Sequence, residues 1–340
     1  MTRYLLLTTL LIGLVSPLSA AEPAATAETI RAAVVKALPL IQKGSIGHRT
    51  KRTCFACHHQ AIPIFAMTAA RSRGISVKEE EVRRHLKFIA DFLGKNRDNY
   101  RKGRGQGGQA DTAGYALWTL EAGGWKPDET TAAATEYLLL RHKDLDHWRG
   151  TANRPPSEKS SFTTTFVALR GLQAFGTKKQ KKRIDERIRV VRGWLEKTTT
   201  KDTEDRVFRL WAMKRAGCEA KKVRAAAREL IEAQRDDGGW AQRDDMKSDA
   251  YATGTALAAL HHAASLAAND PIYQRGIKYL LATQAKDGTW HVHSRSKPFQ
   301  TYFESGFPHG KDQFISLAAS SWAATALAMA LPPVERRASR

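Results

Sequence analysis

The chain has 340 residues, of which 42% are hydrophobic, and its 55 Lys and Arg against 34 Asp and Glu give a formal net charge of +21. This composition excludes a largely disordered chain, and the length suits one large domain or two small ones. The charge favours an acidic redox partner or an anionic surface, although a solvated basic face explains it equally well. Nucleic acid is not an expected partner, because no base-reading motif is present.

The N-terminus has the pattern of a secretory signal peptide. Arg3 precedes a short apolar run from Tyr4 to Val15, and small residues follow at 19–21. A charged start, an apolar stretch and a small-residue cleavage site are typical of a signal peptide, here residues 1–20. We therefore expect a periplasmic or secreted protein, with an uncleaved anchor as the alternative. No transmembrane span is expected after cleavage, because no later stretch approaches about 18 apolar residues.

Residues 54–58 read Cys54-Phe-Ala-Cys57-His58, the attachment signature of c-type haem. In such a site two thiols add across the porphyrin vinyl groups, and the adjoining imidazole ligates the iron. Two intervening residues let both sulfurs reach one edge of the macrocycle. The sequence therefore predicts covalent haem c, with His58 as an iron ligand. Haem is attached outside the cytoplasmic membrane, so this prediction agrees with export.

Two other interpretations of this segment stay open, a structural disulfide and half of a zinc site. A closed zinc site needs four ligands. The only other cysteine is Cys218, and no second C-x-x-C accompanies it. Zinc would therefore need His59 or a distant histidine.

Two kinds of helix alternate along the rest of the chain. The first kind is rich in Ala, Leu and aromatic residues behind a polar or small entry, and the second is amphipathic. The first is expected at 60–67, 111–120, 161–169, 205–213, 249–260 and 316–327, and the second at 77–93, 129–140, 184–196, 220–233 and 271–283. Strand signals are nearly absent. The recurrence, about every 40 to 70 residues, predicts a repeat protein of helical hairpins with the small-residue helices inside.

Two turns share the pattern Q-x-x-D-G-x-W, at Gln234 to Trp240 and at Gln284 to Trp290. Asp-Gly permits a positive φ at a helix end. The tryptophan after it can stack on the glutamine and tie the outer helix to the next unit. A degenerate copy is expected at Gly123-Gly124-Trp125.

These turns resemble the QW-type repeats of the terpenoid-cyclase and protein-prenyltransferase superfamily. The resemblance implies an all-α fold, an α/α toroid of about six helical hairpins in one domain, 25–332, followed by a basic tail, 333–340. A nearer resemblance is to exported bacterial squalene-cyclase-like, or prenyltransferase-repeat, proteins. It is carried by Cys54 to Gln60, Ser248 to Gly254 and Gly306 to Ser316. This resemblance implies a fold and no particular reaction.

Squalene-type cyclases protonate their substrate with a D-x-D-D motif at the mouth of an inner helix, where neighbouring carboxylates raise the pKa of one acid. The matching place here reads Asp245-Met-Lys-Ser248-Asp249, with a serine where an aspartate should stand. Protein prenyltransferases need an Asp, a Cys and a His around zinc, and Cys218 lacks the D-x-C pattern. We therefore expect the cyclase chemistry of the superfamily to be lost.

Parallel inner helices would open at the same end of the ring and place the haem at that mouth, where helix N-termini suit its propionates. The loop before the last inner helix would reach the same end. We therefore expect His309 to be the distal iron ligand and Lys311 a propionate partner. Further candidates at the mouth, able to supply acids and bases, are Asp111, Tyr115, Asp249 and Tyr251.

Together these features favour an exported haem protein that carries electrons or senses a redox state or small ligand. One alternative is an enzyme in the toroid cavity, similar to an isoprenoid cyclase or a polysaccharide lyase. The other is a non-catalytic binding module whose C-x-x-C forms a disulfide.

Overall fold

The computed structural model describes residues 25–298 and 300–334. The expected signal peptide and most of the expected basic tail lie outside these residues. The described chain folds into thirteen α-helices without a named strand, so the predicted all-α class is confirmed. None of the helices in the described ranges has the length and apolar character needed to cross a membrane.

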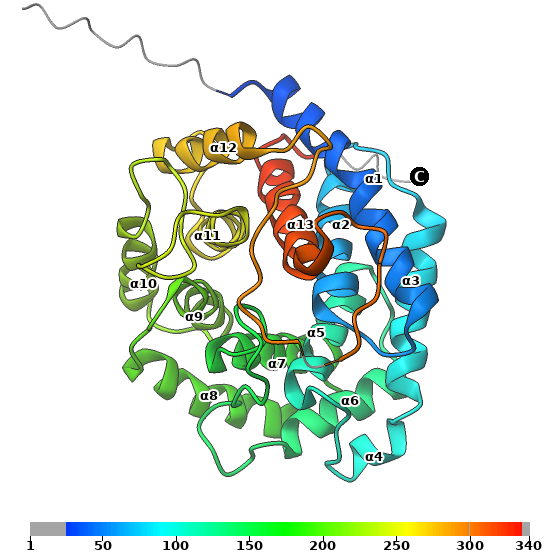
Figure 1. Cartoon of the computed structure of the whole chain (residues 1–340). Helices are drawn as coiled ribbons and strands as arrows, with labels where there is room; N and C mark the ends of the chain where they lie inside the picture. The colour runs from blue at the N-terminus through cyan, green and yellow to red at the C-terminus, as the bar shows by residue number, and fades with distance from the viewer. Residues whose placement is uncertain (1–24, 299, 335–340) are drawn as a thin grey trace, which may run out of the picture.

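Six of the helices form a closed inner ring (Figure 1). Each packs against the next in chain order, and the last packs against the first. They are α2 (Ile62–Arg71), α5 (Gln109–Ala122), α7 (Ser161–Phe175), α9 (Thr203–Arg215), α11 (Ala250–Ala264) and α13 (Gln313–Met329). The six predicted small-residue helices are these six inner helices.

The other helices surround this ring. They are α1 (Ala27–Lys51), α3 (Glu79–Gly94), the short α4 (Arg97–Arg101), α6 (Glu129–Leu140), α8 (Lys181–Lys197), α10 (Ala220–Glu232) and α12 (Pro271–Thr283). The structure therefore has the expected α/α toroid. Helix α1 was not predicted, and it supplies the outer helix of the first hairpin by packing on α13 and α2.

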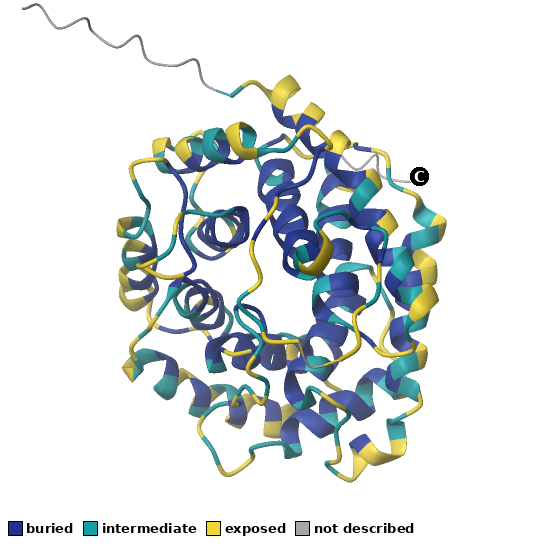
Figure 2. Ribbon diagram, viewed as in Figure 1, coloured by how far each residue is buried: buried dark blue, intermediate teal, exposed yellow. Residues whose placement is uncertain are grey.

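The inner helices are buried on nearly all sides, whereas the outer helices keep an exposed face (Figure 2). Small residues on the inner helices allow close approach. A Cβ built on Gly254 of α11 would lie 2.6 Å from the backbone carbon of Trp322 on α13, and one on Gly114 of α5 would lie 2.9 Å from the backbone carbon of Val167 on α7. The Ala- and Gly-rich composition of these helices therefore reflects how tightly they pack.

The two Q-x-x-D-G-x-W turns join neighbouring hairpins. Gln234 Nε2 donates a hydrogen bond to the carbonyl of Ile272 in α12, and Gln284 Nε2 donates one to the carbonyl of Ala33 in α1, each at 2.9 Å. Gly238 and Gly288 have φ values of +82° and +93°, as expected for Asp-Gly turns. The second turn closes the outer ring, because α12 and α1 come from opposite ends of the domain.

The tryptophans of these turns are buried anchors. Trp240 Nε1 donates to the carbonyl of Leu230 and Trp290 Nε1 to that of Leu280, both at 2.8 Å. The third tryptophan with this geometry is Trp148, whose Nε1 donates to the Leu138 carbonyl at 2.9 Å. The expected degenerate copy at Trp125 differs, because its indole is partly exposed and donates to Asp128 instead.

Candidate functional site

The start of the first inner helix holds the C-x-x-C-H segment. Helix α1 ends at Lys51, a turn exposes Cys54, and a π-helical turn, Cys57–Ala61, then leads into α2. Gln60 stabilises the start of this turn, because its Oε1 accepts a hydrogen bond from the Ala56 N–H at 3.0 Å. One thiol therefore faces solvent, and the other lies inside the ring mouth.

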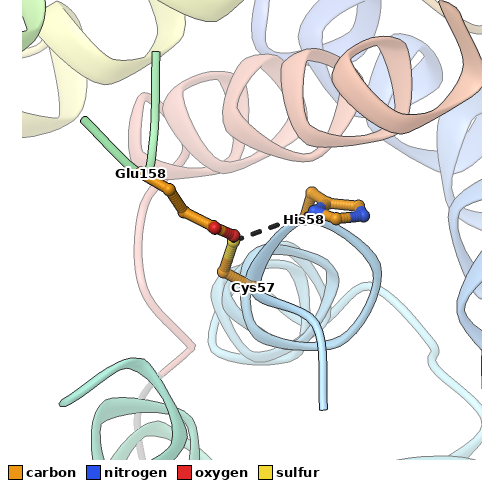
Figure 3. A group of neighbouring side chains, drawn as sticks. All are labelled: Cys57, His58 and Glu158. Carbon is orange, nitrogen blue, oxygen red and sulfur yellow. Dashed lines mark hydrogen bonds between the residues drawn. The ribbon is translucent and has the colours of Figure 1, made fainter. Parts of the chain in front are cut away.

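Cys57, His58 and Glu158 form the cluster in Figure 3. Cys57 Sγ lies 2.6 Å from Glu158 Oε1 and 3.8 Å from His58 Nδ1. Glu158 reaches the cluster from the loop between α6 and α7, where it also pairs with Arg154. The cluster thus joins two segments that lie about 100 residues apart in sequence.

Burial and neighbouring charges set the protonation of this cluster. Burial, together with the charge of Glu158 and the hydrogen bond to it, raises the pKa of the Cys57 thiol well above its usual value. Burial and the nearby His48 and Arg154 lower the pKa of His58 to about 3. At neutral pH the cluster therefore holds a protonated thiol and a neutral imidazole, the form of histidine that ligates metals.

His58 forms part of the wall of a cavity of about 200 Å³, together with Glu158 and Phe314. Cationic residues line the same cavity: Arg154, Lys297 and Lys311. The loop between α12 and α13 crosses this end of the ring (Figure 1), and Ser296 Oγ donates a hydrogen bond to the Pro155 carbonyl at 3.0 Å. Lys311 therefore lines the same cavity as His58, and its role as a propionate partner stays a prediction.

The side chains at this site suit a c-type haem, whereas the cavity is small for one. Cys54 and Cys57 are both free thiols, and His58 lies at the cavity wall. The cavity of about 200 Å³ is smaller than the roughly 300–1,000 Å³ typical of pockets for organic ligands. A macrocycle would therefore require the loop at residues 294–298 and the Arg154 to Glu158 segment to move outward.

The zinc interpretation also has a donor set in this structure. One ligand atom each from Cys57, His58 and Glu158 lies within 4.8 Å of the others. Three protein ligands with an open fourth position are typical of a catalytic zinc site. The third ligand would be Glu158, where the sequence had suggested His59 or a distant histidine. His59 instead packs against Phe314, with ring centroids 5.1 Å apart.

The structure does not bring His309 to His58. The His309 ring stacks on His291 with centroids 4.6 Å apart, and its Nε2 lies 2.8 Å from Thr289 Oγ1. His309 does not line the cavity that contains His58. Its role as a distal iron ligand stays a prediction, and it would require the loop before α13 to rearrange.

Of the four remaining candidates at the ring mouth, Asp111, Tyr115 and Tyr251 are buried and Asp249 is partly buried. Burial raises the pKa of Asp111 to about 7, and Thr164 Oγ1 donates to its Oδ1 at 2.5 Å. Tyr115 OH lies 3.5 Å from the Ser157 carbonyl. Asp249 caps α11, because its Oδ1 accepts hydrogen bonds from the N–H groups of the first turn and its Oδ2 accepts one from Gln242. Asp249 therefore has a structural role as the N-cap of α11.

Tyr251 lies next to Glu204, a residue that the sequence analysis did not identify. Its hydroxyl lies 3.5 Å from Oε1 of Glu204, which also accepts a 2.9 Å hydrogen bond from Thr163 Oγ1. Glu204 Oε2 is buried and has no hydrogen-bond partner among the described residues. Burial, with Asp202 and Asp205 nearby, raises the pKa of Glu204 to about 8. At neutral pH this carboxyl group is therefore largely protonated.

The signal for Glu204 was present in the sequence, which reads Asp202-Thr203-Glu204-Asp205 at the entry of α9. This D-x-E-D pattern stands at the entry of a different inner helix from Asp245 to Asp249, where the superfamily's acid motif was expected. Glu204 lines a second cavity of about 740 Å³ at the mouth. The aromatic residues at the other end of the ring line a separate cavity of about 480 Å³, and the two cavities share no lining residue.

The comparisons with known proteins agree with this architecture. Residues 203–320 match the family described as the Squalene-hopene cyclase C-terminal domain. A search of curated proteins finds no significant match. Among solved structures, a variant of the type II terpene cyclase MstE from Scytonema, in complex with its product merosterolic acid A, is 15% identical. It covers 90% of this chain and 98% of its own, with a TM-score of 0.58.

Two further MstE structures are similar. The apo form is 14% identical, covers 91% of this chain and 99% of its own, and has a TM-score of 0.56. A variant in complex with its substrate, geranylgeranyl dihydroxybenzoate, is 13% identical, covers 90% and 98%, and has a TM-score of 0.57. The chain has the α/α-toroid fold of a type II terpene cyclase. At these identities the similarity is one of fold, and the chemistry of this cyclase-like toroid has to be argued from its own residues.

Proposed function

We propose that this cyclase-like toroid is an exported c-type haem protein that transfers electrons or senses a redox state or small ligand. The observation that carries the proposal is the position of the C-x-x-C-H segment: His58 stands at the wall of a cavity that Lys297 and Lys311 also line. Both thiols are free. A bound haem would supply one-electron redox chemistry.

The residues of this chain would hold the group as follows. Cys54 and Cys57 would provide the two thioether sulfurs, and His58, neutral because burial lowers its pKa to about 3, would provide a nitrogen ligand to the iron. Lys297 and Lys311 would neutralise propionate charge. The net charge of +21 favours docking of an acidic redox partner or an anionic surface.

Removal of either thiol tests this proposal. The full chain, exported and co-expressed with c-type maturation machinery, is expected to carry one covalent haem and to keep its Soret band through acid-acetone extraction. Cys54→Ala and Cys57→Ala should each lose covalent haem or release it on extraction, because each sulfur supplies one thioether bond. Cys218→Ala is the matched control and should keep the haem. Intact-mass spectrometry and absorption spectra measure the outcome.

Other masses and metal contents would contradict the proposal in distinguishable ways. An unmodified mass with a Cys54–Cys57 disulfide would favour the binding-module alternative. An unmodified mass with one zinc per chain, lost in Glu158→Gln, would identify Cys57, His58 and Glu158 as a zinc site instead.

A second candidate function, an acid-catalysed reaction in the toroid, is supported by Glu204. A carboxyl group that is protonated at neutral pH and has one oxygen without a partner can donate a proton to a substrate in the cavity that it lines. This arrangement resembles that expected of a cyclase acid, with Glu204 flanked by Asp202 and Asp205. Turnover of a polyprenyl substrate such as geranylgeranyl dihydroxybenzoate, abolished in Glu204→Gln, would establish it.

The protonation of Glu204 can be tested without a substrate. Its pKa is about 8 in the folded chain against about 4.5 when unfolded, so the folded state holds more protons between these values and wild-type stability falls as pH rises. Glu204→Gln removes this loss. Relative to wild type, its free energy of unfolding should rise by about 1.4 kcal/mol per pH unit between pH 5 and 7. Urea unfolding measures this difference, and Glu129→Gln, at an exposed position, is the control. If the free energies of unfolding of wild type and Glu204→Gln had the same pH dependence, Glu204 would be ionised in the folded chain over this pH range.

A further inference from the structure

A second cluster of possible metal ligands lies outside the C-x-x-C-H cavity. It consists of His291 and His293, directly after the buried Trp290, and Asp312, directly before α13. His291 Nε2 lies 2.9 Å and His293 Nδ1 3.0 Å from the same oxygen, Oδ2 of Asp312. Two imidazole nitrogens therefore converge on one carboxylate oxygen.

The surrounding structure holds these three side chains in place. Between the two histidines, Val292 points inward and is buried, and its N–H donates to Ser316 Oγ on α13 at 3.0 Å. His291 and His293 are both exposed, and their ring centroids lie 4.5 Å apart, so the two side chains lie on the same outer side. Asp312 Oδ1 accepts a 2.8 Å hydrogen bond from the Ser294 N–H, which fixes the carboxylate. The backbone N–H groups of Val292 and Ser294 therefore fasten the segment that carries the two histidines to α13 and to Asp312.

His309 supports the cluster from one side. Its ring lies nearly parallel to that of His291, with an interplanar angle of 5°, and Thr289 Oγ1 holds its Nε2. His309 therefore restricts the rotation of the His291 ring. Its proposed use as a distal iron ligand would remove this support.

We propose that His291, His293 and Asp312 bind a divalent transition-metal ion, with zinc as the ion best suited to this set. The three ligand atoms lie within 4.8 Å of one another. Zinc binds imidazole nitrogen and carboxylate oxygen at about 2.0–2.2 Å, which places neighbouring ligand atoms roughly 3.3 Å apart in a tetrahedral site. Atoms now 2.9–3.0 Å apart need to separate by only a few tenths of an ångström. The His293 side chain is 85% exposed, so water can complete the coordination.

Zinc at this position would fasten the loop over the ring mouth to α13. The loop continues from His293 into Ser294 and Lys297, which line the cavity at His58. A metal ion bridging His293 and Asp312 would restrain the start of this segment. The site is separate from the C-x-x-C-H segment, and the inference does not depend on the proposed haem function.

Titration of the full chain with Zn²⁺ alone tests the site. Wild type is expected to bind one more zinc ion than His293→Ala in isothermal titration calorimetry. Loss of this direct ligand should weaken zinc binding by more than about 100-fold, because even the loss of a residue that only hydrogen-bonds to a metal ligand costs about 10–100-fold. Asp312→Asn should act in the same direction. His293→Ala is the decisive variant, because its exposed side chain can be removed without disturbing the fold.

Two further variants separate this site from other sources of zinc. Cys57→Ala reports zinc held by the C-x-x-C-H cluster and should leave the titration at His293 unchanged. A His261→Ala/His262→Ala double variant, which removes another histidine pair, should also bind as wild type does. An identical titration for wild type and His293→Ala would show that the three residues form a hydrogen-bonded group only and would overturn the proposal.

Limited proteolysis tests the effect on the loop. Zinc should slow tryptic cleavage of the Arg295–Ser296 bond in wild type at least several-fold but leave it unchanged in His293→Ala, with fragments identified by mass spectrometry. Equal protection in both proteins would contradict the tethering role. Unchanged cleavage in a wild type that binds zinc would do so too.

Discussion

Trp240→Ala is expected to lower the free energy of unfolding by about 3–5 kcal/mol, the usual cost of removing a buried tryptophan ring. Trp240 is completely buried, and its indole N–H satisfies the Leu230 carbonyl at the end of α10. Its backbone N–H also donates a hydrogen bond to Thr253 Oγ1 on α11, at 2.9 Å. The substitution therefore leaves a cavity at the joint between α10 and α11.

Chemical denaturation monitored by circular dichroism measures this effect. Trp125→Ala is the matched control, because this tryptophan is only partly buried and bonds to Asp128 in its own turn. We expect Trp148→Ala to resemble Trp240→Ala. Any chromophore bound at the C-x-x-C-H segment should keep its spectrum in the folded fraction. A lost spectrum with unchanged stability would place Trp240 at the site instead of in the framework.

His85→Leu is expected to protect the protein against acid. His85 lies on α3 and is buried, and neither ring nitrogen has a hydrogen-bond partner among the described residues. Burial, helped by nearby Arg49, lowers the pKa of His85 to about 3. The unfolded chain takes up a proton at about pH 6.5 while the folded chain does not, so stability falls as the pH drops below about 6.5.

Leucine removes this proton uptake. With pKa values of about 3 folded and about 6.5 unfolded, the histidine costs about 2 kcal/mol at pH 5 and almost nothing at pH 7.5. The variant should therefore gain about 2 kcal/mol over wild type between pH 7.5 and pH 5, measured by urea unfolding. The comparison of variant and wild type at pH 7.5 is the control, because any difference in stability there comes from the changed packing of the side chain. If the free energies of unfolding of His85→Leu and wild type differed by the same amount at pH 7.5 and at pH 5, His85 would be protonated in the folded chain at pH 5.

Most of the helices could be predicted from the sequence because their signals are local. The bounds of α6 and α12 agree with the predicted 129–140 and 271–283, since Asp128 and Asp270 cap their N-termini and apolar residues recur at helical spacing. Helix α1 was missed because it begins close behind the expected signal peptide and contains Pro39. Its outer position depends on contacts with α13, far away in sequence.

The candidate site was predicted only in part. Cys54, Cys57 and His58 are adjacent in sequence, so their grouping needed no structure. Glu158 comes from a loop about 100 residues later, and no local pattern marks it as a neighbour of Cys57. The sequence placed His309 beside the iron because its loop precedes the last inner helix. The structure instead pairs His309 with His291, because the segment that follows the turn at Trp290 lies against the loop that contains His309.

The repeating helices, the QW-type turns and the C-x-x-C-H segment could be predicted from the sequence, because each depends on residues within a few turns of one another. Which polar groups are buried together depends on the tertiary structure. The pKa of Glu204 rises because ring closure removes water from it and packs it against Thr163 and Tyr251, which lie more than 40 residues away in sequence. The burial of a side chain and its distance to other charges depend on segments that are far apart in sequence and come together only in the closed ring.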